Sequence, residues 1–100
     1  MITIKSIPLK NYTKQFDKSV VVFGSHTCSA CKTVTEIVVP LMEMAHTDTE
    51  FMFLDCEEFV GAADYFNIRF YPTLVYFEYG EEVRRIQSTH IKEIEKALFK

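Results

Sequence analysis

The chain has 100 residues, of which 48% are hydrophobic, and its 14 acidic and 11 basic side chains give a formal net charge of −3. This length supports one hydrophobic core, so we expect a single domain over residues 1–100. The basic residues are scattered and outnumbered, which argues against a nucleic-acid-binding surface.

The N-terminal segment begins with no basic region followed by a long apolar stretch. We therefore expect neither a signal peptide nor a membrane span, and a cytoplasmic location. Residues 2–7 predict a short first strand, and Pro8 suits the first turn of a helix. The apolar side chains of that helix are Leu9, Tyr12 and Phe16. Residues 20–23 form a continuous apolar run without polar alternation, which is typical of a strand buried on both faces.

A long amphipathic helix is predicted from Cys31 onward. Its apolar residues follow the spacing of one helical face and are Val34, Ile37, Val38, Leu41, Met42 and Ala45. Pro40 lies inside this pattern and lacks an N–H group, so we expect it to kink the helix and remove one backbone hydrogen bond.

The second half of the chain predicts two more buried strands, a hairpin and two helices. Residues 51–54 form a strand that ends at Asp55-Cys56, and a short helix follows over residues 59–66. Residues 74–77 and 83–86 form a hairpin, and Ser88 or Thr89 can cap a last helix over residues 91–98. The order βαβαβαββα predicts an α/β fold with a mixed sheet between helices. The aromatic residues expected in the core or at its rim are Tyr65, Phe66, Phe70 and Phe77.

Two cysteines stand where the central strand gives way to the long helix. Cys28 lies at the predicted helix start, and Cys31 follows one turn later. Unpaired N–H groups and the helix dipole favour an anion at that position, and the thiolate is such an anion. A free cysteine is only about 3% ionised at neutral pH, so each unit of pKa depression multiplies its reactive fraction. An odd, sparse set of three cysteines also favours thiol chemistry in a reducing compartment over a disulfide-stapled scaffold. The pattern predicts a redox-active dithiol.

On these residues the chain resembles the thioredoxin family over nearly its whole length. The resemblance lies in the strand before Cys28-x-x-Cys31, in Lys32 directly after it, and in the stretch Ile68-Arg69-x-x-Pro72-Thr73. It implies a thioredoxin-like three-layer sandwich, in which a mixed central sheet is flanked by helices.

The resemblance also implies a protein-disulfide reductase that serves cell redox homeostasis. Cys28 would attack a substrate disulfide and Cys31 would resolve the mixed disulfide. Pro72 would be cis and face the pair, the backbone of Tyr71 would dock the substrate chain, and Thr27 would lie on the same surface. No metal and no cofactor beyond the Cys28–Cys31 disulfide is implied. The implied partners are disulfide-containing proteins and a thioredoxin-reductase-type electron donor, and we expect a monomer.

The active loop departs from the family pattern. Thr27 stands where the family usually has a tryptophan, and Ser29-Ala30 replaces the usual Gly-Pro between the cysteines. Gln87 also stands at the glycine that usually flanks the substrate groove. Losing the proline between the cysteines predicts a more oxidising pair.

The proton-transfer residues of the family are missing as well. Val22 stands at the position of a buried aspartate behind the second cysteine, and Phe53 at the position of its lysine partner. Desolvation raises the pKa of a thiol when no base or cation compensates, so we expect proton removal from Cys31 to be slow at neutral pH. Thr27, His26 and a water reached from solvent are candidate substitutes.

Several alternatives stay open from the sequence. His26 either lowers the pKa of Cys28 or is an exposed loop residue without a role, and Cys56 is expected to be a packed, inert thiol rather than a third redox centre. The chain could instead hold a metal through Cys28, Cys31 and His26, although a fourth zinc ligand is not evident. It could also be a thioredoxin-fold binding module without turnover.

Overall fold

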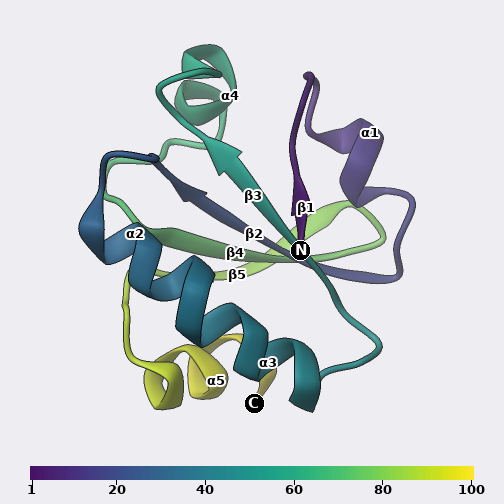
Figure 1. Cartoon of the computed structure of the whole chain (residues 1–100). Helices are drawn as coiled ribbons and strands as arrows, with labels where there is room; N and C mark the ends of the chain where they lie inside the picture. The colour runs from purple at the N-terminus through teal and green to yellow at the C-terminus, as the bar shows by residue number, and fades with distance from the viewer.

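A mixed five-stranded sheet runs through the middle of the molecule (Figure 1). The structure is a computed structural model that describes residues 1–100. The sheet has the order β1-β3-β2-β4-β5, in which β2 pairs parallel with β3 and antiparallel with β4. The strands are β1 (Ile2–Thr3), β2 (Lys18–Gly24), β3 (Glu50–Asp55), β4 (Thr73–Glu78) and β5 (Glu81–Ile86). The predicted element order and the mixed sheet are confirmed.

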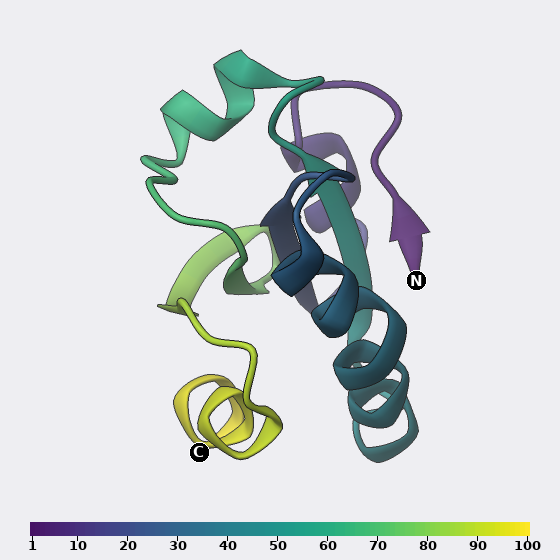
Figure 2. The ribbon, with the colours of Figure 1, turned by 60° about the vertical axis from the view of Figure 1, so that its left-hand side comes forward.

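Helices cover both faces of the sheet (Figures 1 and 2). On one face lie α1 (Lys10–Thr13) and α4 (Val60–Tyr65). On the other lie α5 (Ile91–Phe99) and a long helical segment made of α2 (Ser29–Thr33), the π-helical turn η1 (Val34–Val38) and α3 (Val39–Ala45). None of these helices has the length and apolar character needed to cross a membrane.

The central strand β2 is buried on both faces, as its continuous apolar run predicts. Successive side chains of a strand point to opposite faces, so Val21 and Phe23 join the core on the α1 and α4 side, while Val20 and Val22 join the core on the α3 and α5 side. All four are fully buried. The apolar residues of β2 therefore contribute to the hydrophobic clusters on both faces of the sheet.

The helical segment after Cys28 is irregular in the turn before Pro40. Within η1 the bonding widens, and the Val39 N–H donates to the carbonyl of Val34, five residues back. Pro40 has no N–H for the carbonyl four residues before it, so a regular α-helical ladder cannot run through this point. The disturbance expected from Pro40 thus takes the form of a π turn.

The π turn changes which side chains face the sheet. Val39 and Met42 are fully buried, whereas Ile37 and Leu41 are 59% and 50% exposed. The prediction that Ile37, Leu41 and Ala45 lie on the buried face is therefore wrong. The predicted face assumed 3.6 residues per turn throughout, and a wider turn rotates every later residue about the helix axis.

Two aromatic residues that the sequence predicts in the core or at its rim are exposed instead. Tyr65 is 83% exposed at the end of α4, and Phe70 is 64% exposed in the loop before β4. Phe66 and Phe77 do pack in the core, with ring centroids 5.9 Å apart in an edge-to-face arrangement. The short α4 can bury only one side, so neighbouring aromatic residues have different exposures.

Helix starts differ slightly from the sequence prediction. Pro8 precedes α1, which begins at Lys10, and the Ile7–Pro8 peptide bond is cis. At α5 the cap position is occupied by His90, while the hydroxyl of Ser88 accepts a hydrogen bond from the His90 N–H and donates one to Glu93. Ser88 therefore stabilises the start of α5 from two residues upstream.

Candidate functional site

The candidate site lies at one edge of the sheet, where β2 and β3 end and β4 begins. Phe23 pairs with Thr73 across β2 and β4, which places Pro72 just beyond this pair at the level of Gly24. The Gly24 carbonyl accepts a hydrogen bond of 2.8 Å from the Cys56 N–H, so the segments after β2 and β3 stay in register there. This edge carries all three cysteines and Pro72.

Cys28 occupies the N-cap position of α2. Its backbone is extended (φ −91°, ψ 115°), and its Sγ accepts a hydrogen bond of 3.1 Å from the Cys31 N–H. The side chain is half-buried. Cys28 therefore combines access from solvent with an N–H donor on its sulfur, an arrangement that suits a thiolate.

Cys31 lies one turn further on and is only 1% exposed. Burial is the main cause that raises the pKa of the Cys31 thiol, to about 12, and the neighbouring Cys28 thiol adds to the effect. Gly24 makes room for this sulfur, since a Cβ atom at Gly24 would lie 2.7 Å from Cys31 Sγ. The structure thus pairs a reachable thiol with a buried one that holds its proton.

The loop between β2 and α2 is held by Glu57, which follows β3. Its carboxylate accepts hydrogen bonds from the hydroxyls of Ser25 and Thr27. Ser25 Oγ in turn accepts a bond of 3.1 Å from the Thr27 N–H. Glu57 was not predicted as a site residue, because it lies 30 residues from the loop and no short motif links the two. Thr27, which stands at the usual tryptophan position, is therefore fixed by a carboxylate on the neighbouring segment.

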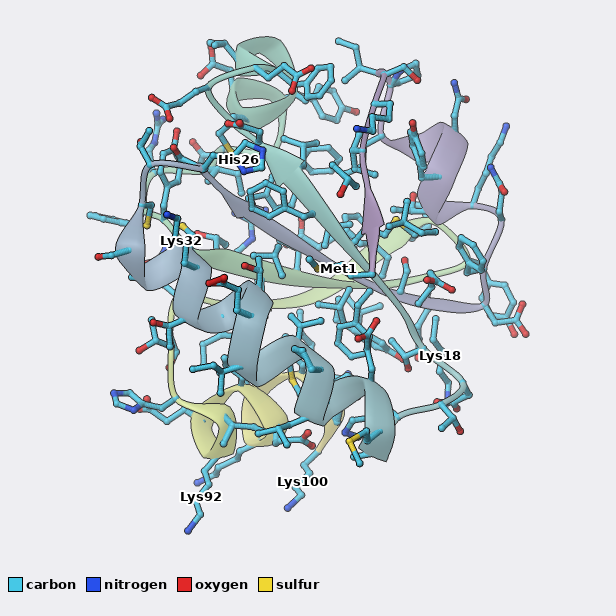
Figure 3. All side chains as sticks on the ribbon, in the orientation of Figure 1. Met1, Lys18, His26, Lys32, Lys92 and Lys100 are labelled. Carbon is cyan, nitrogen blue, oxygen red and sulfur yellow. The ribbon has the colours of Figure 1, made fainter.

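His26 in the same loop has two partners on β3. Its Nε2 atom lies 3.5 Å from Oδ2 of Asp55, and its ring lies against Phe53 with centroids 5.2 Å apart. The His26 side chain remains 69% exposed. Figure 3 places His26 in the loop that leads into α2 and Lys32 on the first part of that helical segment. His26 is thus an exposed residue with a defined position.

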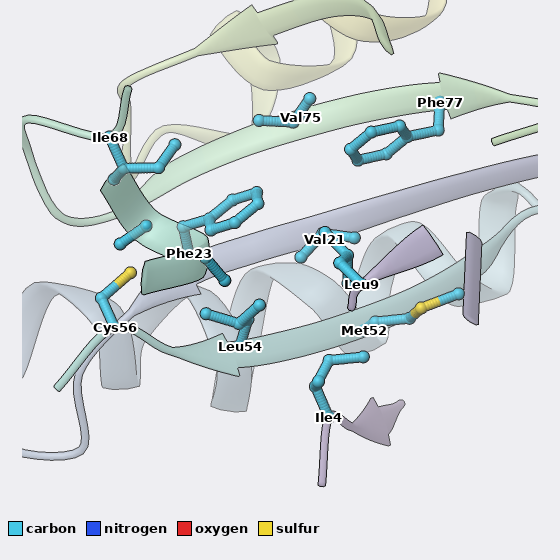
Figure 4. Close-up of a cluster of buried hydrophobic side chains, with 12 residues drawn as sticks. Ile4, Leu9, Val21, Phe23, Met52, Leu54, Cys56, Ile68, Val75 and Phe77 are labelled. Carbon is cyan, nitrogen blue, oxygen red and sulfur yellow. The ribbon is translucent and has the colours of Figure 1, made fainter. Parts of the chain in front are cut away.

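Cys56, whose N–H donates to the Gly24 carbonyl, lies close to the Tyr71 side chain. Cys56 is 2% exposed and belongs to the core cluster that also includes Leu54 and Ile68 (Figure 4). Burial raises the pKa of the Cys56 thiol to about 11, while the Tyr71 side chain lowers it in part. Burial also raises the pKa of Tyr71. The structure therefore places the Tyr71 side chain against the third cysteine, and the Tyr71–Pro72 peptide bond is cis.

The positions of the absent acid and lysine are filled by apolar side chains. Val22 and Phe53 are paired positions on β2 and β3, and they are 0% and 4% exposed. Apart from burial, the largest effects on the pKa of Cys31 come from Cys28, the Ser25 backbone and Cys56. No acid is among these groups, so the buried wall behind the dithiol offers no obvious proton acceptor.

The metal-site alternative lacks a ligand set. No group of three or more His, Cys, Asp or Glu side chains comes together in a way that could hold a metal ion. Cys28, Cys31 and His26 share a loop and a helix start, yet His26 pairs with Asp55 instead. The geometry favours dithiol chemistry at this edge.

A half-exposed thiol at a helix N-cap, a buried thiol one turn later and a mixed sheet between helices together define a dithiol protein of the thioredoxin fold. Residues 4–100 match the family model described as Thioredoxin. The chain belongs to the thioredoxin family.

Known relatives agree with this assignment. Thioredoxin AMT13 of Alternaria alternata is 30% identical over 102 residues, covering 94% of this chain and 86% of that protein. The crystal structure of thioredoxin NaTrxh from Nicotiana alata is 30% identical with a TM-score of 0.82, covering 95% of this chain and 86% of that one. Mitochondrial thioredoxin 3 from Saccharomyces cerevisiae is 26% identical with a TM-score of 0.80, covering 87% and 81%. Family membership supports thiol–disulfide oxidoreductase chemistry in general.

Proposed function

We propose that this protein reduces disulfide bonds of other proteins by dithiol–disulfide exchange. The observation that carries the proposal is the arrangement of the two thiols. Cys28 is half-exposed and its sulfur accepts the Cys31 N–H at 3.1 Å, while Cys31 is 1% exposed one turn further on. One thiol is therefore placed to attack a substrate, and the other is protected until a mixed disulfide brings a reacting sulfur next to it.

In the proposed reaction the Cys28 thiolate attacks one sulfur of a substrate disulfide. The substrate bond breaks, its other sulfur leaves as a thiolate, and a mixed disulfide with Cys28 remains. Cys31 then loses its proton and attacks Cys28 Sγ, which releases the second substrate thiolate and closes the Cys28–Cys31 disulfide. The substrate gains two electrons and the protein loses two. An external dithiol donor of the thioredoxin-reductase type must return them.

The substrate surface is proposed around the same sheet edge. Tyr71, just before Pro72, is 42% exposed, and its backbone lies before the first residue of β4, so it is free to pair with an extended substrate chain. Thr27 borders Cys28 and is held by Glu57. We propose that the protein acts as a monomer, without a further cofactor, in a reducing compartment such as the cytoplasm. The sparse cysteine set supports this compartment.

The test is turnover on a protein disulfide such as that of insulin, with dithiothreitol as the electron donor. We expect wild-type protein to accelerate reduction, Cys28→Ser to abolish the acceleration, and Cys31→Ser to arrest at a mixed disulfide. Cys56→Ser is the matched control and should retain turnover, because Cys56 is buried in the core and pairs with neither active thiol. A wild-type protein without any acceleration would favour the binding-module alternative instead.

A further inference from the structure

A small cavity opens beside Cys31. Its volume is about 130 Å³, and its walls include Thr3, Ser25, His26, Cys31, Lys32 and Phe53. A water molecule occupies about 30 Å³ in the liquid, so the cavity has room for a few waters, and its hydroxyl groups can hydrogen-bond them. The cavity therefore connects a buried thiol to an imidazole without a direct contact between the two.

His26 is oriented in this wall by Asp55. The Asp55 side chain is only 13% exposed and its other oxygen, Oδ1, accepts the Glu57 N–H at 2.9 Å, so the carboxylate is fixed. With Nε2 of His26 lying 3.5 Å from Asp55 Oδ2, the tautomer that carries its hydrogen on Nε2 is favoured. The Nδ1 atom then keeps a lone pair that can accept a proton.

We propose that His26, positioned by Asp55, exchanges protons with Cys31 through water in this cavity and replaces the absent buried acid. The inference rests on the proposed function, because it concerns the resolving step. In that step the Cys31 S–H bond breaks and its proton passes by way of water to Nδ1 of His26. The Cys31 sulfur then bonds to Cys28 Sγ, the mixed disulfide bond breaks, and the second substrate sulfur leaves with the electron pair. His26 later releases its proton to solvent.

Other charged groups near the cavity are less suited to accept this proton. Lys32 lines the wall, but an ammonium group has no free lone pair. The amino group of Met1 is paired at 3.0 Å with Glu43. Glu57, on the segment after β3, already accepts the loop hydroxyls and does not line the cavity. His26 is the imidazole that shares the cavity with Cys31.

The burial of Cys31 makes such a group useful. Its thiol has a pKa raised to about 12, so spontaneous ionisation at neutral pH is rare. General-base assistance contributes roughly 10²–10⁴-fold where the base is well placed. Because His26 acts through water, we expect a smaller effect than this range, about tenfold or more at pH 7.

The experiment isolates the resolving step with a chromogenic aryl disulfide, 5,5′-dithiobis(2-nitrobenzoate), in stopped flow. Attack by Cys28 releases the first coloured thiolate, and attack by Cys31 on the mixed disulfide releases the second. The coloured thiolate leaves without needing a proton, so the second phase reports on Cys31 alone. We expect the second-phase rate of wild type to rise in two steps with pH, first in the histidine range between about pH 5 and 8, and again in the alkaline range as Cys31 ionises.

His26→Gln is expected to slow the second phase about tenfold or more at pH 7 and to remove its lower inflection, while leaving the first phase unchanged. His90→Gln is the matched control, an exposed histidine at the start of α5, and should behave as wild type. A His26→Gln variant that keeps the lower inflection overturns the inference, whether or not its rate falls. A wild-type protein without a second phase overturns the proposed function itself.

Discussion

Alkylation with iodoacetamide at neutral pH should discriminate sharply among the three cysteines. Only Cys28 is half-exposed, whereas Cys31 and Cys56 are 1% and 2% exposed. Burial raises the pKa of Cys31 to about 12 and that of Cys56 to about 11. Since the thiolate is the reactive species, Cys28 should be modified first.

The magnitude follows from the fraction of thiolate. An ordinary free cysteine is about 3% ionised at pH 7, whereas pKa values of about 12 and 11 leave about 0.001% of Cys31 and about 0.01% of Cys56 ionised. These ratios are about 3,000-fold and about 300-fold. A more basic thiolate is also a stronger nucleophile, with a Brønsted slope of about 0.45. This higher intrinsic reactivity reduces the two ratios by factors of about 40 for Cys31 and about 13 for Cys56. Cys31 should therefore react about 80-fold, and Cys56 about 25-fold, more slowly than a free cysteine, before steric protection is counted.

The assay is a timed alkylation of reduced protein, quenched and mapped by peptide mass spectrometry. Modification of Cys28 should be complete while the other two thiols remain unmodified, and raising the pH from 7 to 9 should speed the reaction of Cys31 and Cys56 about tenfold per unit. Denatured protein is the control, since all three cysteines should then react at similar rates. Modification of Cys56 or Cys31 before Cys28 in the folded protein would refute the assignment of the nucleophile.

Four further variants test the packing of β2, of Gly24 beside Cys31 and of α3. Val22→Asp places a carboxyl at a fully buried position and should cost about 3–5 kcal/mol near neutral pH in urea unfolding. Because burial raises the folded-state pKa of an acid, the pH-dependent part of this loss should be absent below about pH 4 and grow as the pH rises, while the cost of burying the neutral carboxyl remains at every pH. The same variant should flatten the alkaline rise of the reductase rate, and identical pH–rate curves would show that proton removal from Cys31 is not limiting. Gly24→Ala puts a methyl 2.7 Å from Cys31 Sγ and should cost about 1–3 kcal/mol, measured in the same way, and unchanged stability would argue against this contact. Met42→Ala should cost about 2–4 kcal/mol and Leu41→Ala within about 0.5, and equal effects would contradict the helix phase set by the π turn.

Much of the fold was predictable because local patterns carry it. The continuous apolar run at residues 20–23 predicts a strand buried on both faces, and β2 is that strand. The Cys-x-x-Cys spacing predicts two thiols one turn apart, and the structure places Cys28 at the N-cap and Cys31 inside the first turn. Both inferences need only neighbouring residues.

The helix phase after Val34 could not be predicted in the same way. Periodicity assumes a constant number of residues per turn, whereas the π turn before Pro40 rotates the face that follows. Pro40 predicts that the helix is disturbed, but the sequence does not indicate whether the helix kinks or forms a wider turn. Leu41, which the pattern places on the buried face, is therefore exposed, while Val39, which lies outside the pattern, is buried.

Contacts between segments that lie far apart in the chain could not be predicted from the sequence. Nothing in the loop before Cys28 indicates that Glu57 holds it, and nothing near His46 indicates a partner. The structure places His46 Nε2 2.7 Å from Glu95 Oε2 and stacks its ring on Phe99 at 3.8 Å. Such pairs depend on how the helices pack on the sheet, which a single sequence does not encode locally.

The most direct measurement of the central claim is a redox titration of the intact protein in glutathione buffers, with each sample trapped by alkylation and mapped by mass spectrometry. The account predicts one reversible two-electron transition in which Cys28 and Cys31 lose their thiols together as a disulfide, while Cys56 remains a thiol throughout. Oxidation that pairs Cys56 with either active thiol, or that leaves Cys28 and Cys31 unlinked across the titration, would contradict it.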